Sequence, residues 1–124
     1  MKGLRFRQGE FNFLVDINYV LHIADYFKVK DELEGIEMLN FQEMFSTGKL
    51  PSEIIFLGKG NIVKGIRVEE VLGVFQFKDV SPIEEGSLMA DFVSTTVKLG
   101  GEIFYVIDPQ KIIGVNYEEK SPSD

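Results

Sequence analysis

The sequence of 124 residues contains no cysteine, no tryptophan and a single histidine. The absence of cysteine excludes disulfides, thiolate catalysis and zinc sites with thiolate ligands. Positive charge is also scarce, because 13 Lys and Arg stand against 20 Asp and Glu and leave a net charge of −7. Since nucleic-acid phosphates are bound through clustered Lys and Arg, this balance argues against nucleic acid as a partner.

Long apolar runs are missing as well. The start, MKGLRFRQGEF, has no apolar stretch of signal-peptide length, and no run approaches the roughly 18 apolar residues that a spanning helix needs. We therefore expect a cytoplasmic protein without membrane insertion. The chain does contain 44% apolar residues, with eleven Phe among them, which is typical of a globular domain.

The chain is related to itself by an internal repeat. The segment GEFNFLVDINYVLHI (9–23) aligns without a gap with GNIVKGIRVEEVLGV (60–74), and nearly every apolar position is kept. Farther on, a second pair of segments aligns in the same order, EGIEMLNFQEMF (34–45) with EIFYVIDPQKII (102–113). The stretch between the two aligned segments is 17 residues shorter in the first copy than in the second. We infer two related halves, the first of which is trimmed.

Each half is predicted to open with a β hairpin. LRFRQGEFNFLVDI and EIIFLGKGNIVKGIRV each contain two runs rich in β-branched and aromatic residues around a turn centred on Gly9 or Gly60. A third hairpin joins FVSTTVKL to EIFYVI through Gly100-Gly101. NFQEMF and PQKII are interpreted as final helical turns capped by Asn40 and Asp108.

A short helical corner is predicted after each of the first two hairpins. Apolar residues at i, i+3 and i+4 indicate one helical turn there rather than a strand. In the second half the corner is VEEVL, in which Glu69 and Glu70 would face water while Val71 and Leu72 turn inward. The segment YFKVKDELEGIEML can hold another short helix.

Catalytic and metal-binding arrangements find little support. His22 is the only imidazole, and no GxSxG surrounds any serine. The acidic pairs, such as Glu69-Glu70 and Glu84-Glu85, are better explained as solvated faces, because neighbouring side chains on a strand diverge. GKGNIVKG matches no phosphate-binding loop and joins two strands, so it is interpreted as a hairpin turn.

The doubled arrangement resembles the CheW-like family of chemotaxis coupling proteins. GEFNFLVDINYVLHI is similar to that family's opening hairpin and KGIRVEEVLGVFQF to its second-half equivalent. FVSTTVKLGGEIFYVIDPQKII is similar to its closing hairpin and final aspartate-led turn. The resemblance covers most of residues 4–114, and none of these motifs is catalytic.

The resemblance implies a mainly β fold of two SH3-like five-stranded barrels packed face to face. It implies one domain over residues 1–115, with half-barrels at about 1–48 and 49–115, followed by a polar tail at 116–124. The implied function is that of a non-enzymatic signalling adaptor without cofactor or metal. Such an adaptor joins the regulatory domain of a sensor histidine kinase to the cytoplasmic tip of a chemoreceptor, and its oligomeric state does not follow from the resemblance.

Family members hold receptor helices in the groove between the two halves, a helix-in-groove mode of recognition. Carried over by motif, the groove candidates in this sequence are Val20, His22, Ile23, Val71 and Val74. His22 replaces an acidic residue that is common there. Core packing is the alternative for Val20 and Val71, and their matched places in the repeat favour it.

One departure from the family pattern affects the expected partners. The family usually carries a longer segment with a G-V-x-N-L-R-G loop, whose arginine and glycines help to form the kinase contact. ADYFKVKDELE (24–34) stands in its place without that motif. The first alternative is therefore a divergent CheW-like module in another motility or regulatory pathway. The second is a small β-barrel enzyme, which would need a pocket with convergent carboxylates of perturbed pKa.

Overall fold

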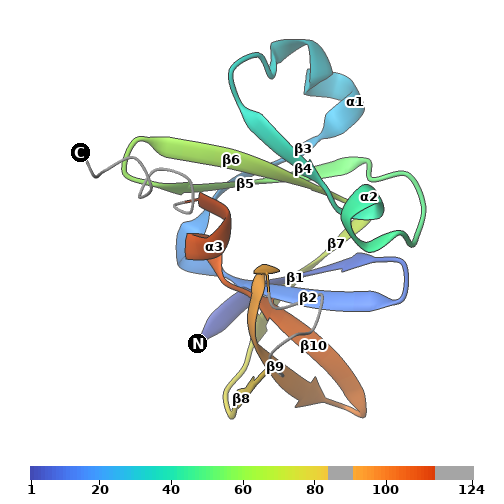
Figure 1. Cartoon of the computed structure of the whole chain (residues 1–124), viewed down its shortest axis with the longest axis vertical. Coiled ribbons are helices and arrows are strands. Elements are labelled where there is room, and N and C mark those ends of the chain that lie inside the picture. The colour runs from blue at the N-terminus through green and yellow to red at the C-terminus, as the bar shows by residue number, and fades with distance from the viewer. Residues whose placement is uncertain (84–90, 114–124) are drawn as a thin grey trace.

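The computed structural model describes residues 1–83 and 91–113, which form two β sheets and short helices (Figure 1). Sheet A has the strand order β7-β1-β2-β10-β9-β8, and sheet B has the order β3-β5-β6-β4. The strands are β1 Lys2–Gln8, β2 Phe11–Asp16, β3 Val20–Asp25, β4 Glu37–Asn40, β5 Glu53–Lys59, β6 Ile62–Val68, β7 Glu70–Gln76, β8 Ser81–Pro82, β9 Val93–Leu99 and β10 Glu102–Ile107. The helices are α1 Tyr26–Val29, α2 Phe41–Phe45 and α3 Pro109–Ile113, with 3₁₀ turns η1 Ile17–Tyr19 and η2 Lys30–Glu32. Helices α2 and α3 lie between the two sheets, and α1 lies beyond the outer end of sheet B (Figure 1).

The two copies of the repeat exchange their hairpins. The β1–β2 hairpin of the first copy lies in sheet A, between β7 and β10 of the second copy. The β5–β6 hairpin of the second copy lies in sheet B, between β3 and β4 of the first. Neither sheet therefore coincides with residues 1–48 or with residues 49–115, because each sheet takes strands from both.

The strand pairing confirms the repeat position by position, at an offset of 51 residues for β1, β2 and β3 against β5, β6 and β7. The offset is 68 residues for β4 against β10, because the first copy is shorter by 17. The β1–β7 and β3–β5 pairings each skip one residue of the edge strand, Leu72 in β7 and Leu21 in β3. The two hairpins turn through glycines with nearly the same left-handed backbone angle, φ of 62° at Gly9 and 64° at Gly60. The hairpin predictions are confirmed, including the third turn at Gly100-Gly101.

The trimmed first copy lacks a counterpart of β8 and β9. Between β3 and β4 it has only α1 and η2, whereas the second copy has β8 and β9 between β7 and β10. Leu14 of β2 packs against β9 in a second apolar cluster with Val97 and Phe104. Its equivalent in β6 is Gly65, where an added Cβ would overlap the side chain of Met38. The first copy thus lacks the strand pair that would cover this position of β6, and β6 has no side chain there to be covered.

The mainly β class and the two related halves are confirmed, but the expected division into two five-stranded barrels needs a correction. The strands divide into six and four, and neither sheet closes into a barrel within residues 1–83 and 91–113. The absence of the strand pair from the first copy accounts for the unequal division, while the hairpin exchange makes each sheet from strands of both halves.

The core lies between the two sheets and continues around α2 and α3 (Figure 1). Phe6 and Phe13 stack on adjacent strands of sheet A with ring centroids 5.2 Å apart, and Phe41 of α2 meets Phe13 edge-on at 5.2 Å. Ile55 and Ile66 enter the same cluster from sheet B. Burying each such side chain stabilises the fold by about 1.5–3 kcal/mol, so the shared cluster joins the sheets.

The predicted helical turns are partly correct. Asn40 caps α2 by accepting a hydrogen bond from the Glu43 N–H, and Asp108 accepts one from the Gln110 N–H at the start of α3. The first corner is the 3₁₀ turn η1. The prediction of a second helical corner at VEEVL is wrong, because β6 and β7 are separated by Glu69 alone. The predicted polar tail, 116–124, and the pair Glu84-Glu85 lie outside the described residues.

Candidate functional site

The five predicted groove residues lie on the two bulged edge strands, one in each sheet. Val20, His22 and Ile23 belong to β3, at the edge of sheet B, while Val71 and Val74 belong to β7, at the edge of sheet A. The structure therefore does not bring them together on one strand or one sheet. Val20 and Ile23 are equivalent in the repeat to Val71 and Val74, whereas the equivalent of His22 is Gly73.

Their exposure separates the five into two kinds. Val20 and Val71 are half-buried and pack against the main core, as the core alternative proposed. Ile23 is 38% exposed and Val74 is 53% exposed. His22 is exposed as well and stacks on Phe56 of β5, with ring centroids 6.2 Å apart. The three exposed residues offer a partner more accessible surface than Val20 and Val71 do.

Sequence reasoning missed Leu21, the residue bulged out of β3. It is 57% exposed and lies over Gly58 of β5, where an added Cβ would overlap its side chain. Together with His22 and Ile23 it forms the exposed segment of β3. The repeat alignment had matched it to Leu72, but a bulge places a side chain differently from regular strand alternation.

An ion-pair cluster of Arg7, Glu69 and Glu70 joins the first hairpin to the β6–β7 junction, and the sequence did not predict it. The Arg7 guanidinium lies 3.0 Å from a carboxylate oxygen of Glu69 and 2.7 Å from one of Glu70. Glu69 also accepts hydrogen bonds from the backbone N–H groups of Gly9 and Lys49, both at 3.0 Å. Its side chain is only 11% exposed, so the prediction that Glu69 faces water is wrong.

The cluster shifts the pKa values of two of its members. Burial raises the pKa of the Glu69 carboxyl, but the Gly9 and Lys49 N–H groups and the Arg7 guanidinium together hold it below its ordinary value. The hydrogen bond to Glu70 raises the pKa of Arg7, against the effect of burial. These contacts tie three segments of backbone together, which is a structural role rather than that of a catalytic acid.

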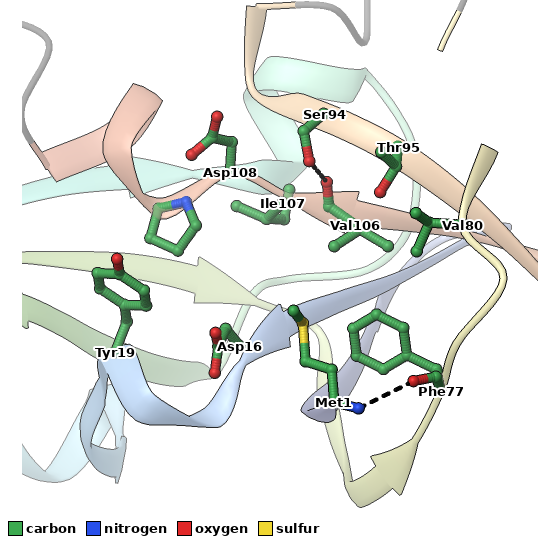
Figure 2. A pocket seen from close by; sticks show the side chains of 11 residues that line it. Met1, Asp16, Tyr19, Phe77, Val80, Ser94, Thr95, Val106, Ile107 and Asp108 are labelled. Carbon is green, nitrogen blue, oxygen red and sulfur yellow. Dashed lines mark hydrogen bonds between the residues drawn. The ribbon is translucent and has the colours of Figure 1, made fainter. Parts of the chain in front are cut away.

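A cavity of about 290 Å³ lies between the N-terminus, η1 and the β9–β10–α3 segment (Figure 2). Asp16 and Tyr19 lie on one side of it, and Ser94, Val106 and Asp108 on the other. The ammonium group of Met1 donates to the Phe77 carbonyl oxygen at 3.1 Å along the rim. The walls are mainly apolar, with two aspartates. None of the five predicted groove residues lines this cavity.

The described residues offer neither a metal cluster nor a membrane-spanning helix. Across 1–83 and 91–113 no group of three or more His, Asp or Glu side chains is placed to hold a metal ion. In that part of the chain no helix has the length and apolarity needed to cross a membrane.

Comparison with known proteins gives a structural likeness and no match in sequence. No family model matches the sequence, and no curated protein does. Among solved structures, the chain is similar to the crystal structure of the scaffolding protein TtCheW from Thermoanaerobacter tengcongensis, with a TM-score of 0.68 and 19% sequence identity. The match covers 86% of this chain and 88% of that one. The chain therefore has the CheW-like fold that the resemblance of its sequence to that family implied.

Proposed function

We propose that the protein is a non-enzymatic signalling adaptor of CheW type, which works in the cytoplasm and couples a sensor histidine kinase to chemoreceptors through protein–protein contacts. The observation that carries the proposal is the likeness to a scaffolding protein over most of both chains. The fold supports it because functions of this kind need surfaces rather than a catalytic pocket.

The enzyme alternative receives little support from the acidic groups. Glu69 has a clearly shifted pKa, but it is held by backbone N–H groups and Arg7 away from the cavity of Figure 2. The two aspartates that do line this cavity, Asp16 and Asp108, each accept a hydrogen bond from a backbone N–H at the start of a helical turn, which is a capping role.

The exposed edge-strand residues are the proposed contacts for an amphipathic receptor helix. Ile23 and Val74 are apolar, exposed and equivalent in the repeat, so they offer anchors of the kind on which helix-in-groove binding depends. Val20 and Val71 support these strands from the core side. His22 and Leu21 complete the exposed segment of β3.

Binding to the receptor tip tests this assignment. We expect Ile23→Asp and Val74→Asp each to cost more than about 1 kcal/mol of binding free energy in calorimetric titration against the receptor tip of the same organism. Ile103→Asp on β10 is the matched control, because Ile103 is also exposed, at 46%, and is not among the proposed contacts. Val20→Asp is unsuitable, since it would place a charge against the core. Equal losses in all three variants would contradict the assignment.

A divergent role with a changed kinase contact is favoured by one feature, the segment between β3 and β4. Residues 26–32 form α1 and η2, and Phe27 of α1 is 49% exposed. Arg67 of β6 stacks on neighbouring Tyr26 and ties this segment to sheet B. We expect the kinase regulatory domain to bind weakly or through another surface than this segment. Tight binding that is lost in Phe27→Asp would contradict that expectation.

A further inference from the structure

The cavity of Figure 2 has an equivalent place in the other half of the molecule. Beside the cavity, the Phe77 N–H donates to the Met1 carbonyl oxygen at 2.8 Å. The repeat relates Met1 to Ser52 and Tyr26 to Phe77, each by 51 positions. In the other half the Tyr26 N–H donates to the Ser52 carbonyl oxygen, also at 2.8 Å. The repeat therefore allows the two places to be compared residue by residue.

The equivalent place is filled by an arginine of the chain itself. Arg67 stands where the cavity has Asp16, and the carbon of its guanidinium lies 3.5 Å from the centroid of the Tyr26 ring. The same guanidinium donates to the Pro51 carbonyl oxygen from Nε at 3.3 Å and from Nη2 at 3.1 Å. A cation above an aromatic face, held by a carbonyl oxygen, is a favourable arrangement.

At the cavity the arginine is replaced by a shorter side chain of opposite charge. The Phe77 ring takes the place of Tyr26 and forms part of the wall, as Figure 2 shows. Asp16 uses Oδ1 to accept from the Asn18 N–H at 2.9 Å, and within the described part of the chain its Oδ2 accepts no hydrogen bond. About 290 Å³ of space remains beside it.

We propose that this cavity receives an arginine side chain of a partner polypeptide, whose guanidinium pairs with Asp16 and lies against the ring of Phe77. The occupant would take the place that Arg67 holds in the other half. Its alkyl stem would pack on the apolar walls, including Val106 and Ile107. The net charge of −7 attracts a cationic segment at long range.

Arginine fits better than lysine for two reasons. Its planar guanidinium can stack on a ring while its N–H groups meet a carboxylate, whereas an ammonium is a compact and strongly hydrated charge. The inference rests on the proposed function only in taking the partner to be a protein. It does not depend on which protein that is.

A ligand titration followed by ¹H–¹⁵N NMR tests the inference directly. N-acetyl-L-arginine amide, which mimics an arginine within a chain, should give saturating shifts at Asp16, Tyr19 and Ser94 in about the millimolar range. The citrulline analogue has nearly the same shape without the charge and should bind at least about tenfold more weakly. The lysine analogue should also bind more weakly. Equal binding of the citrulline analogue, or tighter binding of free L-arginine, would overturn the proposal.

Substitutions at Asp16 provide the matched variants. Asp16→Asn keeps an oxygen that can cap the Asn18 N–H but removes the charge, so we expect about a tenfold loss of affinity for the arginine amide. Asp16→Arg should fill the cavity from within, as Arg67 does, and abolish binding. Glu43→Gln on α2 is the control and should change nothing. The amide spectra themselves report whether each variant is folded.

The result can be separated from that of the adaptor proposal. If receptor or kinase binding is measured but the arginine amide does not bind, or binds Asp16→Asn unchanged, this inference fails and the adaptor function stands. If the amide binds at Asp16 while neither proposed partner binds, the adaptor proposal fails and the cavity assignment stands.

Discussion

Glu69 joins three segments that are distant in the sequence, and this explains why it could not be predicted. Its partners come from Arg7 and Gly9 of the first hairpin and from Lys49, 20 residues before it. Read alone, Glu69-Glu70 is an acidic pair of the kind that normally faces water. By contrast, Ile23 and Val74 are exposed, since an edge strand leaves one side free, and their contact with a partner stays a prediction.

Replacing Glu69 tests the cluster at this scale. We expect Glu69→Gln to lower the free energy of unfolding at pH 7 by about 1–2 kcal/mol, because the amide keeps the acceptor for Gly9 and Lys49 but loses the charge facing Arg7. Glu70→Gln should cost less than about 1 kcal/mol, since its side chain is 46% exposed. Urea melts of both variants measure the difference.

The pKa of Glu69 gives this prediction a pH dependence. The folded state lowers that pKa, so the stabilisation is present above the unfolded value of about 4.3 and is lost as the pH falls through the folded value. The difference between wild type and Glu69→Gln should therefore be constant near neutral pH and should shrink below about pH 4. A difference that grows in acid would show that Glu69 is not held as a carboxylate.

At the scale of elements, the hairpins and helix caps were predictable because their signals are local. Gly9 and Gly60 marked the turns, and Asn40 and Asp108 marked the starts of α2 and α3. The structure after the second hairpin could not be predicted in the same way, because the spacing of Val68, Val71 and Leu72 fits a helical turn as well as a bulged strand. Pairing with β1 decides in favour of the strand.

The two equivalent turns offer a matched pair of substitutions. Gly9 and Gly60 have similar left-handed φ angles, but a Cβ at Gly9 would overlap Thr47 while one at Gly60 meets nothing within 4 Å. Gly60→Ala should therefore cost only the backbone penalty, about 1–2 kcal/mol. Gly9→Ala should cost clearly more in the same thermal or urea melt. Equal costs would mean that the Thr47 side chain can move away from the added Cβ without a loss of stability.

At the scale of the whole molecule, the hairpin exchange ties the two copies of the repeat into one unit. A repeat in the sequence shows which positions are equivalent, but it does not say whether a strand pairs within its own copy or with the other. The exchange therefore appears only in the structure, where β1–β2 pairs with β7 and β10. The apolar cluster shared by both sheets strengthens the connection.

The exchange predicts that the protein unfolds in one step. Residues 1–48 alone would leave the edges of the β1–β2 hairpin unpaired, so we expect neither 1–48 nor 49–124 to fold on its own. Circular dichroism and tyrosine fluorescence should report coincident urea transitions for the full chain. Two separated transitions, or a folded half, would show that the copies are independent.

The measurement that tests the adaptor function most directly is a reconstitution of receptor-controlled kinase activity. The histidine kinase and the chemoreceptor of the same organism, with the receptor in lipid vesicles, are assayed for kinase autophosphorylation with and without this protein. If it couples the two, adding it should make the phosphorylation rate respond to receptor ligand, and Ile23→Asp with Val74→Asp should weaken that response. A rate that is unchanged by the protein at concentrations that saturate its binding to either partner would contradict the account.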